Sequence, residues 1–250
     1  MSDDKRLQLT LRRQALVTED GYTRWQVATD VRSILARQTA LLLCDVWDNH
    51  WCRGANERLA VMLPRMSAVV TAARSQGVHI IHAPSDTMAF YTGTPARLRA
   101  QAVPLVEPPP ARELPDPHVP IDDSDGGSDT GEKSWHTAWS RQHPAITIDE
   151  ERDIISADGR EVYSYLRQQN IEQFLIMGVH TNMCILHRSF AIKQMVRWGM
   201  EVALIRDLTD TMYNPALSPF VAHEEGTRLV VEFIEKLWCP TLLSSDLVPA

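Results

Sequence analysis

Short apolar runs that alternate with helix-length segments constrain the fold of this chain more than any other feature of its sequence. The most complete run, Thr39–Cys44, ends directly at Asp45. Continuous runs of this kind are typical of parallel strands that helices cover on both faces. Similar strands are predicted at 78–82, 153–156, 174–179 and 202–205, and helices at 64–76, 95–101, 158–169, 182–198 and 218–238. The alternation predicts a three-layer α/β fold with a doubly wound, mainly parallel sheet.

Two segments depart from this alternation. In residues 1–37, leucines occupy alternate positions from Leu7 to Leu11, and Asp20 and Gly21 precede a second run of β-type residues. This pattern predicts an N-terminal arm or hairpin. Residues 103–134 are rich in Pro, Asp, Gly and Ser and are too long for an ordinary connection, so we expect an insertion loop. We expect the whole chain, 1–250, to form one domain.

Charge and composition narrow the range of partners. The chain has 250 residues and a net charge of −7, which disfavours nucleic acid and anionic membrane surfaces as main partners. No apolar run reaches the roughly 18 residues that a membrane span needs. The N-terminal residues lack the apolar stretch of a secretory signal, and we expect a cytoplasmic protein. The four cysteines have no paired Cys or His spacing, which argues against a structural zinc site.

Cys184 is the best-marked chemical residue of the sequence. It lies in Gly-Val-His-Thr-Asn-Met-Cys, where a predicted strand ends at Val179 and the next helix begins. Thr181 or Asn182 can cap that helix. The free amides of a helix start favour a thiolate and can hold an oxyanion during acyl transfer. The alternative is a small core residue, because cysteine is often buried.

Asp45 directly follows the apolar strand 39–44, at the end of a parallel strand where ligands bind in such folds. A carboxylate at this place can accept the proton of a thiol as a general base. The alternative is an aspartate that begins a loop and bonds the backbone.

These residues resemble the isochorismatase-like superfamily of cysteine hydrolases, which includes nicotinamidases and related amidases. The resemblance rests on the strand that ends in Asp45 and on the strand that ends in Gly-Val-x-Thr-x-x-Cys, and it spans roughly residues 38–238. It implies an Asp–Lys–Cys triad with Cys184 as nucleophile and Asp45 as base. It also implies a cis peptide before His180, with the amides of His180 and Cys184 forming the oxyanion hole.

The lysine of this triad is missing from the sequence. The family places it at the end of the third strand, but residues 153–157 contain no lysine. Two cations lie upstream, Lys133 in the insertion and Arg141 nearer to the sheet. We favour Arg141 as the catalytic cation. An arginine can support a negative charge, although it cannot shuttle a proton as lysine can.

Other side chains could shape the site. Trp47 and Trp51 flank the loop after Asp45 and could wall a pocket for a flat or apolar substrate, although simple packing is the alternative. His180 could donate to the substrate or fill space beside it. Asp and His residues follow the first two strands and have the chemistry for a transition metal, but not the spacing that the family uses. We expect no metal and no cofactor. The four candidates are Asp48, His50, His82 and Asp86.

The sequence therefore predicts a cysteine-dependent hydrolase of a small amide or related C–N-bonded substrate. Two alternatives stay open. One is an isochorismatase-like scaffold without activity that serves as a binding module, and the other is a vinyl-ether hydrolase that does not use its thiol covalently. The resemblance also implies a homo-oligomer.

Overall fold

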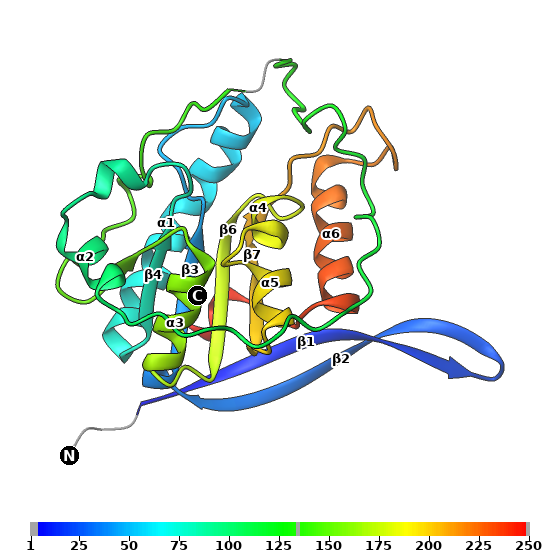
Figure 1. The fold of residues 1–250 in the computed structure, drawn as a ribbon. Helices are drawn as coiled ribbons and strands as arrows, with labels where there is room; N and C mark the ends of the chain where they lie inside the picture. Colours follow the sequence, from blue (N-terminus) through cyan, green and yellow to red (C-terminus); the bar gives the residue numbers. More distant parts are fainter. Residues whose placement is uncertain (1–4, 134–135, 249–250) are drawn as a thin grey trace.

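The computed structural model describes residues 5–133 and 136–248, and these residues build one eight-stranded sheet with helices on both faces (Figure 1). The strand order is β2-β1-β8-β7-β6-β3-β4-β5. The predicted fold class is confirmed. The strands are β1 (Arg6–Glu19), β2 (Tyr22–Leu35), β3 (Thr39–Cys44), β4 (His79–Ala83), β5 (Ile154–Ile155), β6 (Gln173–Val179), β7 (Val202–Asp210) and β8 (Thr241–Leu242). The helices are α1 (Arg53–Gln76), α2 (Pro95–Gln101), α3 (Gly159–Gln168), α4 (Cys184–His187), α5 (Ile192–Arg197) and α6 (His223–Leu237).

The middle of the sheet is covered on both faces, as the apolar runs predict. Every residue of β3 and of β6 is buried. On one face, the alternate side chains of these strands pack against α1, and on the other they pack against α3, α5 and α6. Strands β4, β3, β6 and β7 run parallel, so their carboxyl ends meet along one edge of the sheet. Polar residues that follow these strands are therefore brought together at that edge.

The N-terminal hairpin is present and is longer than the sequence pattern indicates. Strands β1 and β2 pair along their full length around Asp20 and Gly21, whose φ angles are 52° and 81°. Positive φ at both central residues is typical of a type I′ turn, which suits the twist of a hairpin. Leu7, Leu9 and Leu11 bury their side chains in the layer that α1 covers. The outer part of the hairpin extends beyond α6 (Figure 1).

Three predicted helices differ from the structure in extent. Helix α1 begins at Arg53, and Pro64 lies in its interior rather than in its first turn. Buried side chains on both sides of the proline, such as Leu59 and Met66, hold the helix together there. The predicted helix 182–198 is divided into α4 and α5. The last helix begins at His223 because Phe220 has a φ of 62°, which no α-helix permits.

The insertion has no helix or strand among its described residues, 103–133, as predicted; its residue 134 lies outside the described residues. It crosses the surface from α2 past α5 and α6 to the carboxyl edge of the sheet (Figure 1). None of the described helices is long and apolar enough to cross a membrane.

Candidate active site

Asp45 lies at the carboxyl end of β3 and is fully buried. Its φ of 50° is unusual for a residue other than glycine, and such strain often marks functional positions. One carboxylate oxygen, Oδ1, accepts the backbone N–H of Ser85 at 2.7 Å. The other, Oδ2, accepts Nε of Arg188 at 3.0 Å. The carboxylate is therefore held in a fixed orientation from two sides.

A glycine allows the strand that carries the cysteine to approach Asp45. Gly178 in β6 pairs with Cys44 and has a φ of 127°. A Cβ at this position would overlap the carbonyl oxygen of Cys44. The peptide between Val179 and His180 is cis, as the resemblance implies. The chain then turns and begins α4 at Cys184, beside Asp45.

The thiol of Cys184 is half-buried and hydrogen-bonds to the carboxylate of Asp45. Burial raises the pKa of Cys184, and the negative charge of Asp45 raises it further. The positive charge of Arg188 and a hydrogen bond from the His180 amide lower the pKa of the thiol, but not enough to compensate. The expectation of a resting thiolate is thus not met. Helix α4 has only four residues, so the charge at its start is small, whereas Asp45 lies in contact.

The pKa of Asp45 is shifted in the same direction as that of Cys184. Burial raises the pKa of its carboxyl group, while Arg188 and the hydrogen bonds from Cys184 and Ser85 lower it. A raised carboxyl pKa brings a base closer to the pKa of the group from which it takes a proton. The pair is therefore suited to move one proton between sulfur and oxygen.

Arg188 is the cation of the site, and the sequence analysis missed it. Its Nε bonds to Asp45, and its Nη2 donates to Asp86 at 3.1 Å. Burial alone would lower the pKa of Arg188, but the charges of Asp45 and Cys184 raise it, so the guanidinium stays charged. It lies four residues after Cys184, directly after the last residue of α4, and its backbone is extended. The sequence pattern of one continuous helix over 182–198 gives no sign of this break, so no local signal identified Arg188.

The two cations that the sequence analysis considered lie elsewhere. The guanidinium carbon of Arg141 is 5.4 Å from the centre of the Phe90 ring, and its backbone amide donates to Asp48. Lys133 is exposed in the insertion. No contact of either side chain with Asp45 or Cys184 is found among the described residues, 5–133 and 136–248.

The predicted substrate-binding residues form one aromatic cluster beside Cys184. Trp47 stacks on Trp139 with ring centres 3.9 Å apart, and Trp51 packs in the same cluster. His180 meets His50 edge to face at 4.8 Å. Burial lowers the pKa of His50 to about 4 and that of His180 to about 3, so both rings are neutral near neutral pH. The wall of the site is apolar and uncharged on this side.

A cavity of about 420 Å³ borders the thiol, and none of the rings of this aromatic cluster lines it. Asp123 of the insertion reaches this cavity and accepts a hydrogen bond of 2.7 Å from the side-chain amide of Asn182. The same amide group of Asn182 also donates to the carbonyl of Met212 at 3.0 Å. The cavity is lined by Asp123, Asn182, Met183, Cys184, His187 and Arg188. A larger cavity, about 540 Å³, lies near the start of β4 and contains none of the predicted site residues.

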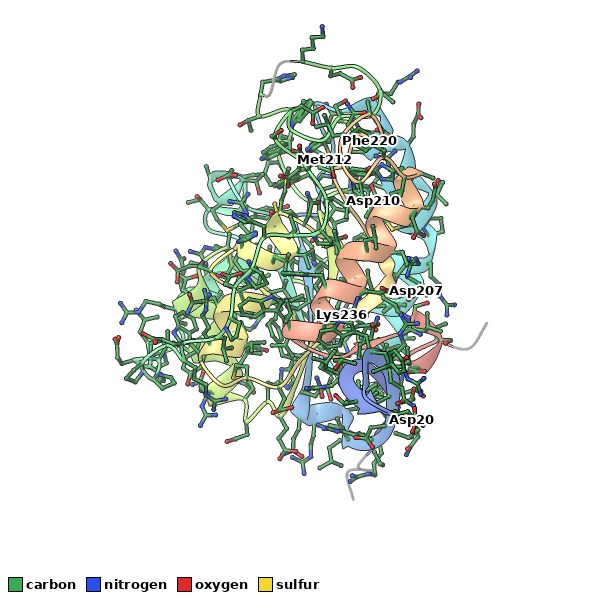
Figure 2. All side chains as sticks on the ribbon, turned by 90° about the vertical axis from the view of Figure 1, so that its right-hand side faces the viewer. Asp20, Asp207, Asp210, Met212, Phe220 and Lys236 are labelled. Carbon is green, nitrogen blue, oxygen red and sulfur yellow. The ribbon has the colours of Figure 1, made fainter. Side chains whose placement is uncertain are left out.

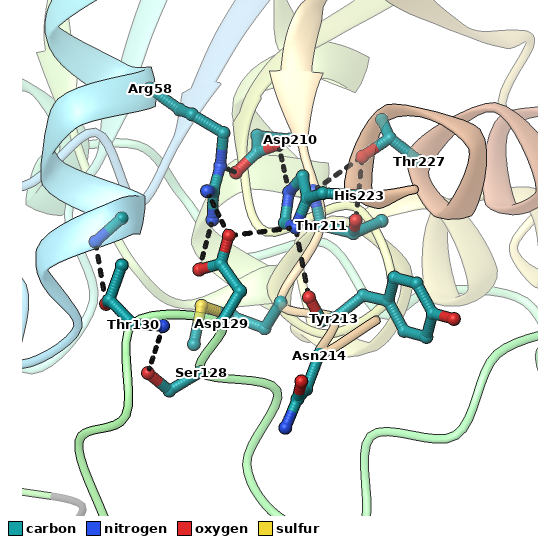
Figure 3. A network of polar contacts seen from close by, with 12 residues as sticks. Arg58, Ser128, Asp129, Thr130, Asp210, Thr211, Tyr213, Asn214, His223 and Thr227 are labelled. Atoms are coloured by element: carbon teal, nitrogen blue, oxygen red, sulfur yellow. Dashed lines mark hydrogen bonds and ion pairs between the residues drawn. The ribbon is translucent and has the colours of Figure 1, made fainter. Parts of the chain in front are cut away.

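A network of ion pairs ties the insertion to the sheet beside the site (Figure 3). Arg58 of α1 bonds to Asp129 of the insertion at 2.7 Å and to Asp210 at the end of β7 at 2.8 Å. His223 donates from Nε2 to Asp210 at 2.9 Å, and its Nδ1 lies 3.0 Å from the carbonyl of Tyr213. Asp210 in turn accepts the Thr181 amide through its backbone carbonyl. The network therefore supports the turn that presents Cys184.

The four candidate metal ligands do not converge. Asp48 accepts hydrogen bonds from Ser140, and Asp86 pairs with Arg188. The ring of His82 lies between Gln142 and Asp153, whereas His50 belongs to the aromatic cluster. Within residues 5–133 and 136–248, no group of three or more His, Cys, Asp and Glu side chains has the geometry to hold a metal ion.

The chain is similar to known proteins in sequence and in fold. The sequence model of the isochorismatase domain matches residues 39–216. No curated protein matches the chain significantly. A cysteine hydrolase from Pseudomonas syringae pv. phaseolicola 1448A is 16% identical, with 85% of this chain and 92% of that chain covered and a TM-score of 0.53. An isochorismatase from Pseudomonas putida KT2440 is 11% identical, with 85% and 91% covered and the same TM-score of 0.53. At these identities the two structures show the shared fold.

Proposed function

Since the chain belongs to the isochorismatase family, we propose that it is a cysteine-dependent hydrolase of a small amide or related C–N-bonded substrate. The observation that carries this proposal is the convergence of three groups on one point. The carboxylate of Asp45 bonds both to the thiol of Cys184 and to the guanidinium of Arg188. A nucleophile, a base and a fixed positive charge are the parts that acyl transfer requires.

In the first half of the reaction, Cys184 transfers its proton to Asp45 as its sulfur attacks the carbonyl carbon. The carbonyl oxygen becomes an oxyanion, which the amides of His180 and Cys184 bind in this proposal. The hydrogen bond from the His180 amide to the sulfur supports the assignment of that amide. The protonated Asp45 then donates its proton to the nitrogen of the leaving group. The C–N bond breaks, an amine leaves, and a thioester with Cys184 remains.

In the second half, Asp45 accepts a proton from a water molecule that attacks the thioester carbon. The carbon–sulfur bond breaks, and the acid product leaves. The proton returns from Asp45 to the sulfur of Cys184, which restores the starting state. The arrangement needs one residue that alternates between base and acid, and Asp45 is the buried residue in contact with the thiol.

Arg188 has an electrostatic role in this scheme. It keeps the carboxylate of Asp45 charged in a buried environment, and it does not exchange protons because the guanidinium pKa lies far above neutral. Arg188 therefore takes the place that we had assigned to Arg141. In the Asp–Lys–Cys triad of the isochorismatase-like superfamily, the lysine could exchange a proton. An arginine cannot, so proton transfer at this site depends more heavily on Asp45.

The cavity beside Cys184 favours a small substrate with polar groups, because Asp123, His187 and Arg188 line it. The rings of Trp47, Trp139 and His180 are buried behind the thiol and do not line this cavity. The cavity of about 420 Å³ has room for a small molecule rather than a polymer. A cytoplasmic location and a homo-oligomeric state remain predictions.

The test is a panel of small aliphatic and aromatic amides, with release of ammonia or amine as the readout. Cys184→Ser and Asp45→Asn should each lower kcat by at least about a hundredfold, because each removes one half of the proton transfer. Addition of hydroxylamine during turnover should yield a hydroxamate from the thioester. Activity on a vinyl ether that survives Cys184→Ala would support the non-covalent alternative. Absence of any turnover, with ligands that still bind, would support the binding module.

A further inference from the structure

The outer edge of the sheet is an exposed strand that pairs with β1 on one side and with no other strand of the described residues on the other. Strand β2 has 14 residues and forms the end of the strand order. Its residues from Tyr22 to Ser33 are all exposed. The strand contains no proline and no lysine, the residues that commonly protect an edge from pairing. The opposite edge, β5, has only two residues. Only β2 therefore offers a long template for another strand.

The turn decides which backbone groups of β2 face outward. The residues that flank a two-residue turn, Glu19 and Tyr22, form a hydrogen-bonded pair, and such pairs alternate along a hairpin. Two contacts agree with this assignment: the Ala36 amide donates to the Lys5 carbonyl, whereas the Thr10 amide points away from β2 and donates to Asp246. The outward-facing N–H and C=O groups thus belong to Thr23, Trp25, Val27, Thr29 and Val31, whereas the carbonyl of Ser33 already accepts Nη2 of Arg6.

We propose that β2 pairs antiparallel with β2 of a second copy of this chain, about a two-fold axis at Val27. The axis stands perpendicular to the sheet, so the two eight-stranded sheets join into one. Val27 then lies opposite Val27 of the second copy. Trp25 of each chain lies opposite Thr29 of the other. All of these residues present outward backbone groups, so a continuous ladder of hydrogen bonds can form.

Charge complementarity selects this register. With the axis at Val27, Arg24 lies opposite Asp30 of the second copy, and symmetry repeats this pair of opposite charges. Within its own chain Arg24 bonds to Glu19 and Asp30 bonds to Arg32, so the new pairs join two existing ion pairs across the interface. If the axis moves to Ala28, Arg24 lies opposite Arg32, and two pairs of like charges result. If it moves to Gln26, Arg24 lies opposite Ala28 and the ion pairs are lost. Opposite charges across a strand pair stabilise it and like charges destabilise it.

The same pairing brings exposed apolar side chains of the two chains together along one face of the joined sheet. Val31 is 63% exposed, Val27 54% and Trp25 43%. They share one face of the hairpin with Leu16, which pairs with Trp25 and is 57% exposed. Lys236 at the end of α6 lies over the Trp25 ring, and Figure 2 shows this lysine above the hairpin whose turn carries Asp20. With the axis at Val27, these side chains become cross-strand neighbours and partly cover one another.

The first test is the mass of the full chain in solution as a function of concentration, by sedimentation or light scattering. We expect the wild type to be a dimer or a larger assembly that contains this dimer. Arg24→Glu and Asp30→Arg should each raise the dissociation constant about tenfold or more, since two ion pairs become repulsive. The double variant should restore association to within about threefold of the wild type. All of these positions are exposed, so the variants keep the fold.

The second test is a cysteine cross-link. In the proposed register the two copies of residue 27 have Cα atoms about 5.5 Å apart, a distance that a disulfide can bridge. Oxidation should therefore convert Val27→Cys to a covalent dimer. Val31→Cys is the matched control, because its two copies would lie roughly 27 Å apart. The wild type controls for the four native cysteines.

Each contrary outcome overturns the proposal. A wild type that stays monomeric at all concentrations rules out a second copy as the occupant of this edge, and leaves a strand of another protein. A dimer that tolerates Arg24→Glu and does not cross-link through Val27→Cys has its interface elsewhere. A cross-link through Val31→Cys shows a different register.

Discussion

The two charged neighbours of Cys184 should shift its titration in opposite directions. Asp45 raises the pKa of the thiol, and Arg188 lowers it. Replacing Asp45 by Asn should therefore lower the apparent pKa of Cys184, although the same substitution removes the general base and abolishes turnover. Replacing Arg188 by Gln should raise the pKa of the thiol. Arg188→Lys keeps the charge and should leave the pKa near that of the wild type.

The size of these shifts follows from the geometry. Two unit charges about 4 Å apart interact with about 4 kcal/mol at an effective dielectric constant of about 20. Since one pKa unit corresponds to about 1.4 kcal/mol, the removal of one such charge can change the pKa of the thiol by at most about three units. Asp45 is fully buried, so Asp45→Asn should lower the pKa of the thiol by about two units. The side chain of Arg188 is 32% exposed, and solvent screening reduces the effect of Arg188→Gln to about one unit.

The assay is the rate of iodoacetamide labelling at Cys184 between about pH 6 and pH 10, mapped by mass spectrometry, because only the thiolate reacts. It needs no substrate, so it can be done before one is known. The wild type should label more slowly at neutral pH than a free cysteine, whose pKa is about 8.5. If Asp45→Asn slows labelling at every pH, or if Arg188→Lys behaves like Arg188→Gln, the charges do not control this thiol and the reasoning is wrong.

Three further predictions concern the surroundings of the site. Gly178→Ala should lower the free energy of unfolding by about 3 kcal/mol or more in urea titrations, because a Cβ there overlaps the Cys44 carbonyl; an effect below about 1 kcal/mol would contradict the packing. Arg141→Gln should leave both the thiol titration and the amide hydrolysis unchanged, since its guanidinium lies over Phe90; a loss equal to that of Arg188→Gln would return Arg141 to the catalytic role. Burial alone would lower the pKa of His223, but Asp210 outweighs burial and raises it, so its protonated form is stabilised on folding. That stability is fully present below the unfolded pKa of about 6.5 and is lost as the pH rises through the folded value; wild type and His223→Asn should therefore differ more in unfolding free energy at about pH 6 than at about pH 9, and an equal difference at both would refute it.

The sequence identified those parts of the molecule that local rules govern. The strand Thr39–Cys44 appears at its predicted bounds because a short continuous apolar run that is followed by a polar residue is typical of a buried parallel strand. Gly77 ends α1 with a φ of 96°, as a glycine after the last helical residue predicts. The places of Asp45 and Cys184 in the fold were predictable for the same reason, since each follows a strand that the apolar pattern marks.

What the sequence did not reveal depends on contacts between distant segments. Arg188 was overlooked because residues 182–198 have the pattern of one helix, in which it would be an ordinary surface cation. In the structure α4 stops after His187, and Arg188 adopts an extended backbone. The break lies where Ser189 accepts the Gly159 amide at the start of α3, a contact 30 residues away in sequence. No periodicity within 182–198 encodes that contact.

In the proposed mechanism, the raised pKa of Cys184 explains why Asp45 has to be in contact with the sulfur. A thiol that is deprotonated at rest can attack without a base, and its environment then only has to stabilise a charge. Here burial and the charge of Asp45 keep the thiol protonated. Arg188 lowers the pKa of Asp45 and so favours the carboxylate form, which can accept the proton of the thiol. Proton transfer can then accompany the attack, at a moment when the oxyanion is forming and the His180 amide can bind it. The protonated thiol reacts slowly with oxidants and alkylating agents until a carbonyl group is in place. This protects a cysteine that borders an open cavity.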